Sequence, residues 1–327
     1  MNITVVGSGS WGTALAILLH NNGNSVKIWS INPKEADEIN IKHELGYLPG
    51  VKIPDEIYCE LDLSKAMEKA ELVVLAVPSK AIRSCSKNIA PYIKDGTILV
   101  SVAKGIEEGS LKRLSEVIEE EISNAKIVIL SGPSHAEEVS RGIPTVVAVS
   151  SKDDEISTKV ADIFKNEFFR VYPNDDLVGV EVGGAIKNVI ALCAGVIDGL
   201  GMGDNTKAAL ITRGLAELTR LGVAMGGKPK TFAGLTGIGD LVVTCASNHS
   251  RNHNAGVLIG KGYSLDEAVS EIKMVVEGVN TAKAAKALGE KYGVEMPIVT
   301  EANKVLFEGK DPKQAVLDLM TRNQRFE

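Results

Sequence analysis

The chain has 327 residues, a length that favours two domains over one. Hydrophobic residues make up 44% of it, enough for a sizeable core, and the net charge of −6 argues against a broad basic surface for nucleic acid or anionic lipid. No run reaches the roughly 18 apolar residues of a membrane span, so we expect no membrane insertion.

The first residues and the cysteines both indicate a cytoplasmic protein. The opening MNITVVGSGS carries no basic segment or cleavage site, so we expect no signal peptide. The cysteines are scattered and form no CxxC pair, which predicts reduced thiols and no zinc site. They are Cys59, Cys85, Cys193 and Cys245.

Short runs rich in Val and Ile alternate with helical patterns in the first half of the chain. This alternation predicts an α/β domain with a doubly wound, mostly parallel sheet. The predicted strands are 2–7, 25–30, 71–77, 97–103, 126–132 and 145–150. After about residue 175 strand patterns nearly vanish, so we predict a first domain over 1–178 and an all-helical domain over 179–327.

The first strand leads into VVGSGSWG, which places Gly7, Gly9 and Gly12 as GxGxxG before an apolar helix. In this context the motif predicts a dinucleotide site. Gly7 permits the tight turn, Gly9 lets a pyrophosphate approach the backbone, and Gly12 allows close packing of helix and strand. The helix N-terminus adds N–H donors and a positive dipole end.

The second strand ends in SINPKE, without an acidic residue at the position that binds an adenosine ribose. Ser30 stands near that position, and the nearest carboxylate is that of Glu35. Asn32 and Lys34 could contact a 2′-phosphate, so the sequence leans towards NADP over NAD. An ordinary polar turn is the alternative.

Three segments follow predicted strands, where ligands bind in open α/β sheets. AVPS contains Pro78, SVAKG contains Lys104, and SGPSHAEE contains Ser134. We predict that Pro78 and Lys104 contact the cofactor. Lys104, between an apolar strand and Gly105, is a candidate site cation, although an exposed loop lysine is the alternative. For Ser134 we predict a capping box with Glu137.

The helical half opens on EVGGAIKNVIALCAG, where Lys187 lies on a face of small residues. Its neighbours one and two turns away are Gly183, Gly184, Ala191 and Ala194. They leave a hollow for a ligand or for another backbone, and an ammonium there is partly desolvated and suited to proton transfer. We therefore predict that Lys187 is catalytic and that Asp240 orients it or balances its charge.

The polar run TCASNHSRNHN spans residues 244–254. Thr244 lies one turn beyond Asp240, so both can face one pocket. Ser250, Arg251 and Asn252 precede a helical pattern ending at Gly260, and a hydroxyl, guanidinium and amide at a helix start suit a phosphate. A solvated helix end is the alternative.

Two neighbouring features of this run carry other interpretations. His249 and His253 form an HxxxH pair that could share a helical face, but no third ligand accompanies them, so we predict no metal site. Cys245 has no activating partner and is interpreted as a packing residue. Further on, we predict a capping box from Ser264 to Glu267, and a helix opening at TAKAAK that stops at Gly293.

Taken together, these motifs resemble the bacterial-type NAD(P)-dependent glycerol-3-phosphate dehydrogenases over nearly the whole chain. The motifs that carry the resemblance are GSGSWGTALA, SVAKGIE, SGPSHAEEV, EVGGAIKNVIAL, GLTGIGDLVVTCAS with SRNHNAG, and VVEGVNTA. The resemblance implies a Rossmann domain, a helical domain and interconversion of dihydroxyacetone phosphate and sn-glycerol 3-phosphate for glycerophospholipid synthesis. Many relatives carry arginine after the second strand, where this chain reads SINPK.

The resemblance also implies roles for individual residues. Lys187 is the proton-transferring lysine and Lys104 its partner at the carbonyl. Other substrate-binding positions are Gly132, Ser134, Asp240, Ser250, Arg251 and Asn252. The remaining cofactor-contacting positions are Ser10, Trp11, Ala136, Arg251, Val275 and Glu277.

Two other functions are compatible with part of these features. One is a related two-domain dehydrogenase acting on another hydroxy acid or sugar acid, and the other is a non-catalytic NAD(P)-sensing module. A sensor has no use for Lys104, Lys187 and the polar run together. We expect a small phosphorylated substrate as partner, no nucleic acid, and we allow for a homodimer.

Overall fold

The computed structural model describes residues 1–323. Residues 324–327, which the predicted helical domain includes, lie outside the described part. The chain forms two compact units, one of Met1–Lys104 with Lys112–Glu181 and one of Gly105–Leu111 with Val182–Glu327.

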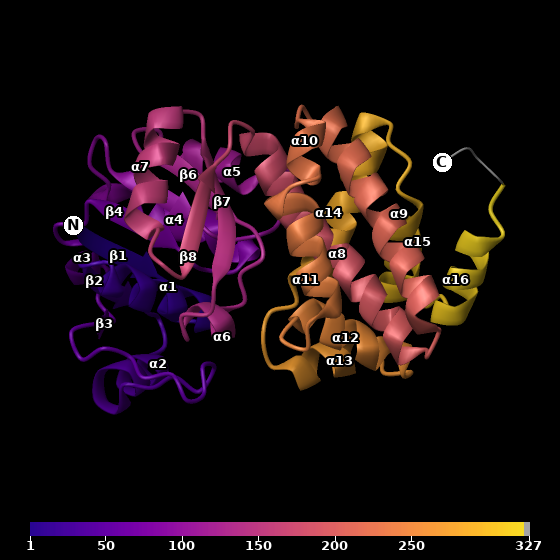
Figure 1. Cartoon of the computed structure of the whole chain (residues 1–327), viewed down its shortest axis with the longest axis horizontal. Helices are drawn as coiled ribbons and strands as arrows, with labels where there is room; N and C mark the ends of the chain where they lie inside the picture. The colour runs from indigo at the N-terminus through magenta and orange to yellow at the C-terminus, as the bar shows by residue number, and fades with distance from the viewer. Residues whose placement is uncertain (324–327) are drawn as a thin grey trace. The chain divides into compact units, whose positions relative to one another are not determined.

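The first unit is built on one eight-stranded sheet (Figure 1). Its strands are β1 (Asn2–Val6), β2 (Ser25–Trp29), β3 (Tyr58–Glu60), β4 (Leu72–Leu75), β5 (Ile98–Ser101), β6 (Lys126–Ser131), β7 (Thr145–Ser151) and β8 (Phe169–Pro173). They lie in the order β3-β2-β1-β4-β5-β6-β7-β8, and only β6 and β7 pair antiparallel. The predicted fold class is confirmed, and the sequence patterns missed β3 and β8.

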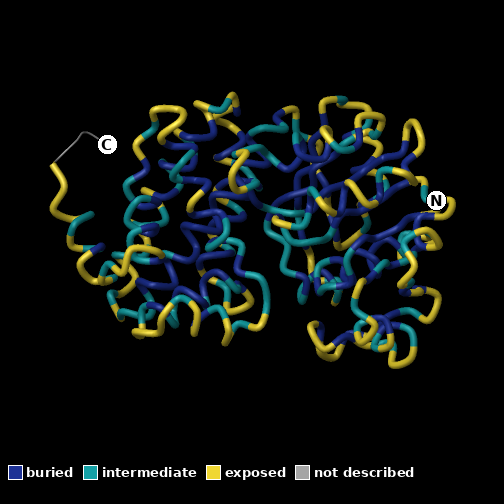
Figure 2. Tube along the Cα trace, turned by 180° about the vertical axis from the view of Figure 1, so that it is seen from behind, coloured by how far each residue is buried: buried dark blue, intermediate teal, exposed yellow. Residues whose placement is uncertain are grey.

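Successive residues of the central strands bury opposite faces of the sheet, as the period of two in a strand requires. Val5 packs in a core cluster with α1 (Ser10–Asn21) and α7 (Asp154–Phe164), and Val6 packs in another with α4 (Ile82–Ile89) and α5 (Leu114–Glu121). Figure 2 shows buried residues, in dark blue, running through the interior of this unit. The unit also contains α2 (Pro33–Asp37), α3 (Leu63–Met67) and α6 (Ala136–Val139).

The second unit is helical throughout its described residues, apart from loops. Its helices are α8 (Leu177–Gly199, which begins in the first unit), α9 (Gly203–Ala224), α10 (Pro229–Phe232), α11 (Asp240–Ala246), α12 (Arg251–Gly260), α13 (Leu265–Ile272), α14 (Glu277–Tyr292), α15 (Pro297–Phe307) and α16 (Pro312–Met320). A short π-helical turn, η4 (Leu235–Gly239), precedes α11. The predicted helical half is therefore present.

Helix α8 is the central helix of this unit. It is long and apolar enough to cross a membrane by length and composition alone, but 94% of its most apolar window is buried inside the protein. That burial is typical of a core helix. Its side chains thus project into the unit's interior, which is where a desolvated Lys187 has to lie.

Glycines let α12 cross α8 with their backbones almost in contact. A Cβ built on Gly195 would stand 2.0 Å from the carbonyl oxygen of His253, and one on Gly256 would stand 2.0 Å from that of Leu192. Gly199 and Gly260 make the same approach one turn further along. Because backbone cannot yield as a flexible side chain does, this crossing fixes α12 on α8.

Two predicted helix ends have clear outcomes. Ser264 and Glu267 form the predicted capping box before α13. Helix α14 stops before Gly293, whose φ of 66° ends it as predicted, but it starts at Glu277 rather than at the TAKAAK segment. The extra turn packs directly on α8, because a Cβ on its buried Gly278 would stand 2.5 Å from the Asn188 carbonyl oxygen.

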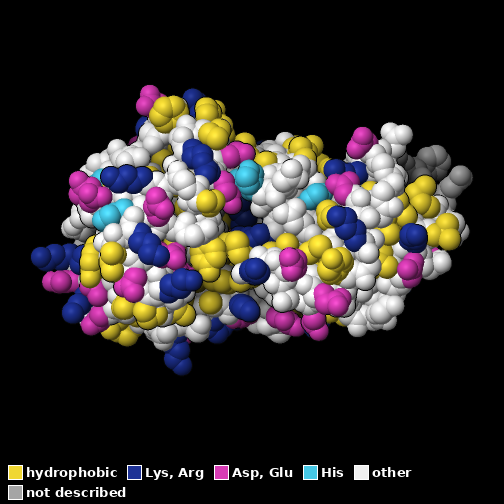
Figure 3. Space-filling model, turned by 90° about the horizontal axis from the view of Figure 1, so that it is seen from below, with side chains coloured by type: hydrophobic (Ala, Val, Ile, Leu, Met, Phe, Trp, Pro, Cys, Tyr) yellow, Lys and Arg dark blue, Asp and Glu magenta, His cyan; other side chains and the backbone are white. Residues whose placement is uncertain are grey.

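Charged side chains of both signs are interspersed over the face shown in Figure 3, with apolar side chains between them. The chain carries 36 Lys and Arg against 42 Asp and Glu. A cation that binds an anionic ligand must therefore act locally, through its own contacts, because the overall charge repels anions.

Candidate active site

Lys187 on α8 is buried and held by two side chains of α11. Only 5% of the residue is exposed, and its Nζ donates to Asp240 Oδ1 at 3.0 Å and to Thr244 Oγ1 at 2.7 Å. Asp240 and Thr244 are themselves 1% and 4% exposed. A buried ammonium needs such a carboxylate, because an unpaired charge in the interior costs several kcal/mol. The structure thus brings together the three residues that the spacing suggested.

The backbone before α11 determines where Asp240 lies. Gly183, one turn before Lys187, has no room for a side chain, since its Cβ would stand 2.5 Å from the Thr236 carbonyl oxygen in η4. Part of the hollow predicted around Lys187 is therefore filled by another backbone segment. This close approach delivers Asp240, at the start of α11, directly to the Lys187 ammonium.

The start of α12 is ordered by its own side chains. The Ser250 hydroxyl is the N-cap and accepts the His253 N–H at 3.2 Å. Asn252 donates its amide Nδ2 to Asn188 Oδ1 at 3.0 Å and accepts the Gly278 N–H at 2.8 Å on its Oδ1. Arg251 is the first helical residue between them. The predicted phosphate anchor is thus tied through Asn252 to Asn188, the residue after Lys187.

The two histidines of the polar run do not share a helical face. His249 lies in the turn before α12, whereas His253 is inside the helix and its Nε2 lies 2.7 Å from Asp198 Oδ2 on α8. Lys207 of α9 donates to the same carboxylate oxygen at 2.7 Å. His253 therefore adds a second polar bridge between α12 and α8.

In the first unit, Lys104, Gly132 and Ser134 meet beyond the ends of β5 and β6. Lys104 Nζ donates to the Gly132 carbonyl oxygen at 2.8 Å, and the Ser134 hydroxyl donates to the same oxygen at 2.9 Å. Gly132 has a φ of 139°, and a Cβ there would stand 3.0 Å from the Val147 Cα. Glycine is required because the backbone turns sharply against β7.

The predicted capping box at Ser134 is wrong. Helix α6 starts at Ala136, so His135 occupies the N-cap position and makes no side-chain cap. Ser134 lies one residue too early to cap, and its hydroxyl is bound to Gly132 instead. The correction leaves Ser134 beside Lys104 at the edge of the sheet where ligands bind.

The glycine turn after β1 has the shape that a dinucleotide needs. A Cβ on Gly7, whose φ is 116°, would stand 2.5 Å from the Ala76 carbonyl oxygen, and one on Gly12 would stand 2.1 Å from the Gly7 carbonyl oxygen. Gly9, in contrast, faces open space, with nothing within 4 Å of a built Cβ. A pyrophosphate can approach the backbone there, at the N-terminus of α1. The residues present therefore fit the phosphates of NAD or NADP.

The other residues predicted to contact the cofactor are distributed over both units. Ser10 is buried in the first turn of α1, and Trp11 packs on the core there. Also in the first unit are Lys34 in α2, Pro78 after β4 and Ala136 in α6. Arg251, Val275 and Glu277 belong to the second unit, at or before the starts of α12 and α14.

Cys245 is fully buried next to Thr244 in α11, and burial raises the pKa of its thiol to about 12. All four cysteines are free thiols. A thiol with such a pKa is protonated at neutral pH and is a poor nucleophile. The packing role predicted for Cys245 agrees with this burial.

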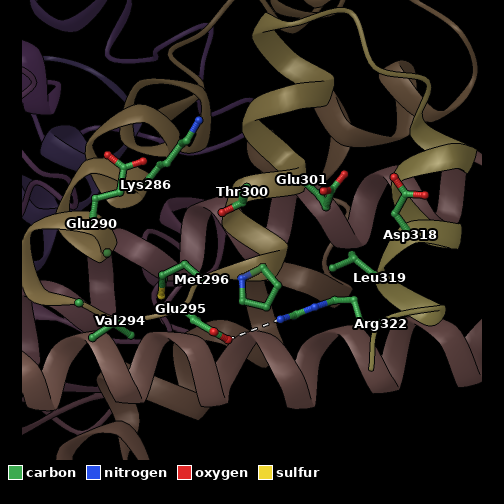
Figure 4. A pocket seen from close by; sticks show the side chains of 13 residues that line it. Lys286, Glu290, Val294, Glu295, Met296, Thr300, Glu301, Asp318, Leu319 and Arg322 are labelled. Atoms are coloured by element: carbon green, nitrogen blue, oxygen red, sulfur yellow. Dashed lines mark ion pairs between the residues drawn. The ribbon is translucent and has the colours of Figure 1, made fainter. Parts of the chain in front are cut away.

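A pocket of about 520 Å³ lies between α14, α15 and α16, and none of the predicted site residues lines it (Figure 4). Several of its charged side chains are paired with protein groups. Arg322 lies 3.5 Å from Glu295, and the lining residues Glu301 and Asp318 both pair with Lys310.

Two residues beside the site were not predicted to belong to it. Asn188 follows Lys187 directly and could have been found as a polar residue next to the predicted buried lysine in a mostly apolar helix. Glu35 is the other: it was named only as the nearest carboxylate after the second strand, and its contact with Ser8 at the end of β2 was not predicted. No local pattern signals that contact, which depends on how α2 turns.

Comparisons with known proteins agree with this geometry. Residues 2–157 match the family model for the N-terminal domain of NAD-dependent glycerol-3-phosphate dehydrogenase, and residues 176–317 match the model for its C-terminal domain.

Curated relatives and a solved structure point the same way. The chain is 54% identical to glycerol-3-phosphate dehydrogenase (NAD(P)+) of Fusobacterium nucleatum, over 100% of this chain and 98% of that one. It is 55% identical to the protein of that name from Pelotomaculum thermopropionicum, over 99% and 94%. The crystal structure of glycerol-3-phosphate dehydrogenase from Coxiella burnetii superposes with a TM-score of 0.95 at 38% identity, covering 98% of this chain and 99% of that one. The chain belongs to the NAD(P)-dependent glycerol-3-phosphate dehydrogenase family.

Proposed function

We propose that this chain reduces dihydroxyacetone phosphate to sn-glycerol 3-phosphate in the cytoplasm, for glycerophospholipid synthesis, with Lys187 as the proton donor and acceptor. The observation that carries the proposal is the buried Lys187 ammonium between Asp240 and Thr244. Family membership supports the reaction, and the residue roles below are our assignment. We further propose a dinucleotide-binding domain over 1–178 and a substrate domain over 179–327.

When bound, NAD(P)H supplies the hydride that reduces the C2 carbonyl. Lys187 then donates a proton to the C2 oxygen as that atom gains negative charge. Asp240 keeps the ammonium in place, and Thr244 fixes its direction by accepting a second hydrogen bond. In the reverse direction Lys187 takes up the same proton.

Lys104 is assigned to the substrate carbonyl, where a second cation stabilises developing negative charge. Gly132 and Ser134, which are bonded to Lys104 or to each other, complete this set in the first unit. The Gly132 carbonyl oxygen accepts a hydrogen bond from the Lys104 ammonium and orients it at the edge of the sheet where ligands bind.

Arg251, with Ser250 and Asn252, is assigned to the substrate phosphate. A guanidinium at a helix N-terminus combines a fixed fork of donors with the positive end of the helix dipole. Asn252 also links this anchor to the residue after Lys187. The phosphate anchor and the proton-donating lysine would thus be held by neighbouring parts of the second unit.

The test is the oxidation of NADH and of NADPH with dihydroxyacetone phosphate and, in parallel, with dihydroxyacetone. We expect rapid oxidation with the phosphorylated ketone and at least about a hundredfold lower kcat/KM without the phosphate, the effect of losing charge-assisted hydrogen bonds. The Arg251→Ala variant should lose most of this discrimination.

Equal rates with both ketones would contradict the phosphate anchor and favour a related dehydrogenase acting on another hydroxy acid. Tight cofactor binding without turnover of either ketone would favour a nucleotide-sensing module.

A further inference from the structure

The carboxylate of Glu35 lies at the carboxyl end of β2, although Glu35 belongs to the following helix. The Ser8 hydroxyl, in the glycine turn, donates to Glu35 Oε2, and the Oγ atoms of Ser8 and Ser30 lie 2.6 Å apart. Asn32 donates its Nδ2 to Glu35 Oε1 at 2.9 Å. The carboxylate is thus bonded both to the glycine turn and to the residues directly after β2.

Helix α2 is what returns Glu35 to the strand end. Asn32 caps it by accepting the Lys34 N–H at 3.1 Å, and Pro33 occupies its first position. One helical turn then carries the chain back over Ser30, so that Glu35 points at the strand end while Lys34 is exposed. Glu35 lies six residues beyond Trp29, the last residue of β2, so the sequence alone does not place its carboxylate at the end of that strand.

The surroundings keep this carboxylate in place. Ser8 and Ser30 are each 3% exposed, so their hydroxyls have few partners besides Glu35 and each other. Burial raises the pKa of Cys59 in the neighbouring strand β3 to about 12, and the negative charge of Glu35 adds to that rise. Glu35 therefore adds negative electrostatic potential at the end of β2.

In dinucleotide-binding folds, an acidic side chain at the end of the second strand accepts a hydrogen bond from the adenosine 2′-hydroxyl. A 2′-phosphate at the same position would bring two like charges together, and an unscreened pair at a few ångströms is repulsive. Helix α2 has only five residues, and Lys34 is its one exposed cation. It offers a 2′-phosphate no buried cationic partner.

We propose that Glu35 is the specificity-determining residue for the cofactor, and that it makes this chain prefer NAD to NADP. The proposal rests on the family's use of these dinucleotides and reverses the preference that SINPK suggested. Glu35 accepts a hydrogen bond from the 2′-hydroxyl of NAD and repels the 2′-phosphate of NADP. Ser8 and Ser30 act as positioning residues for its carboxylate.

The experiment measures binding without turnover. NADH and NADPH are titrated against the wild type and Glu35→Gln, with nicotinamide fluorescence as the readout. The wild type should bind NADH at least roughly tenfold more tightly than NADPH, and Glu35→Gln should shrink this ratio by about tenfold. Its NADH affinity should stay within about threefold, because the amide still accepts one hydrogen bond.

Asp37→Asn is the matched control. Asp37 is exposed on the same helix, and its loss removes one negative charge without touching Ser8 or Ser30. It should retain the wild-type ratio. Competition by 5′-AMP and by adenosine 2′,5′-bisphosphate tests whether the preference arises at the 2′ position, since these compounds differ only in the 2′-phosphate. This measurement uses the wild type and does not depend on whether a variant folds.

Two outcomes would overturn the proposal. One is a wild type that binds NADPH as tightly as NADH. The other is a folded Glu35→Gln that keeps the wild-type ratio of the two affinities, including the case in which both fall equally. A wild type that binds neither nucleotide would overturn the dinucleotide assignment itself and this proposal with it.

Discussion

Asn252 at the start of α12 and Asn188 on α8 are joined by a hydrogen bond of 3.0 Å between their side chains. Each is the immediate neighbour of a residue assigned to the reaction, Arg251 in one case and Lys187 in the other. The bond therefore couples the proposed phosphate anchor to the proposed proton donor. Both residues are buried, so water does not compete for this hydrogen bond.

Replacing Asn252 by alanine should weaken both stability and substrate binding. It leaves the Gly278 N–H without its acceptor, which costs about 1–3 kcal/mol of unfolding free energy. We expect KM for dihydroxyacetone phosphate to rise about tenfold or more, as measured by steady-state kinetics and urea unfolding. Asn254→Ala, which removes a solvent-side bond to Asn248, should change neither by a comparable amount. An unaltered KM in a destabilised Asn252→Ala would remove Asn252 from the anchor.

Lys187→Ala should reduce kcat by about 10²- to 10⁴-fold, the usual contribution of a general acid or base. It also leaves Asp240 buried without its cation, so the variant should be less stable. Cofactor binding, measured by fluorescence, shows whether the protein remains folded. Lys286→Ala, on α14 away from these residues, should keep wild-type turnover. Near wild-type turnover by Lys187→Ala would contradict its assignment.

Gly9→Ala should raise the Kd for NADH and for NADPH together while leaving the melting temperature nearly unchanged. The new methyl group meets no protein atom within 4 Å and occupies the space into which a pyrophosphate would approach. Gly12→Ala, whose methyl would stand 2.1 Å from the Gly7 carbonyl oxygen, should instead lower the melting temperature. Unchanged nucleotide affinity in a well-folded Gly9→Ala would place the phosphates elsewhere.

Gly256→Ala should destabilise the helical unit by about 1–3 kcal/mol or more, because its methyl would press on the Leu192 carbonyl of α8. The same displacement moves Arg251 and Asn252 away from Lys187, so kcat/KM should fall as well. Chemical denaturation and kinetics at matched temperature measure the two effects. Lys261→Ala, at the exposed end of α12, serves as the control and should leave both nearly unchanged.

The raised pKa of Glu217 should make the stability of the fold depend on pH. It is 1% exposed on α9 and accepts the Ile298 N–H at 2.7 Å and the Val299 N–H at 3.3 Å, at the start of α15. Burial raises its pKa from 4.5 to about 7 despite these bonds. The folded state therefore holds a proton that the unfolded state releases between these pH values, so stability falls as pH rises through them.

We expect this fall to be on the order of 3 kcal/mol between pH 4.5 and 8, since a tenfold change in proton affinity corresponds to about 1.4 kcal/mol. Glu217→Gln should flatten the curve of unfolding free energy against pH, and the exposed Glu290→Gln should not. Parallel curves for wild type and Glu217→Gln would show that Glu217 ionises normally.

Much of the fold and part of the site could be predicted from the sequence. The central strands carry continuous apolar runs because both of their faces are buried, and the glycine turn has a fixed spacing. The contact between Lys187 and Asp240 was suggested by a lone cation on a face of small residues. Their roles in the reaction stay predictions.

The features that were missed depend on tertiary contacts. Strand β8, at the sheet edge, alternates buried and exposed residues and ends in Pro173, so it has no apolar run. Ser134 has the sequence of a capping residue but lies one position too early, and its hydroxyl donates to the Gly132 carbonyl oxygen, which also accepts from Lys104. Glu35 reaches β2 only because a single helical turn folds back.

The crossing of α8 and α12 also limits where a residue can be inserted in this chain. On each helix, two glycines about one turn apart meet the backbone of the other helix, so the two helices pack in a single register. Adding a residue to α8 between Lys187 and Gly195 would rotate the two by about 100° relative to each other. Such an insertion would therefore turn Lys187 away from α11 while the glycine contacts with α12 stay in register.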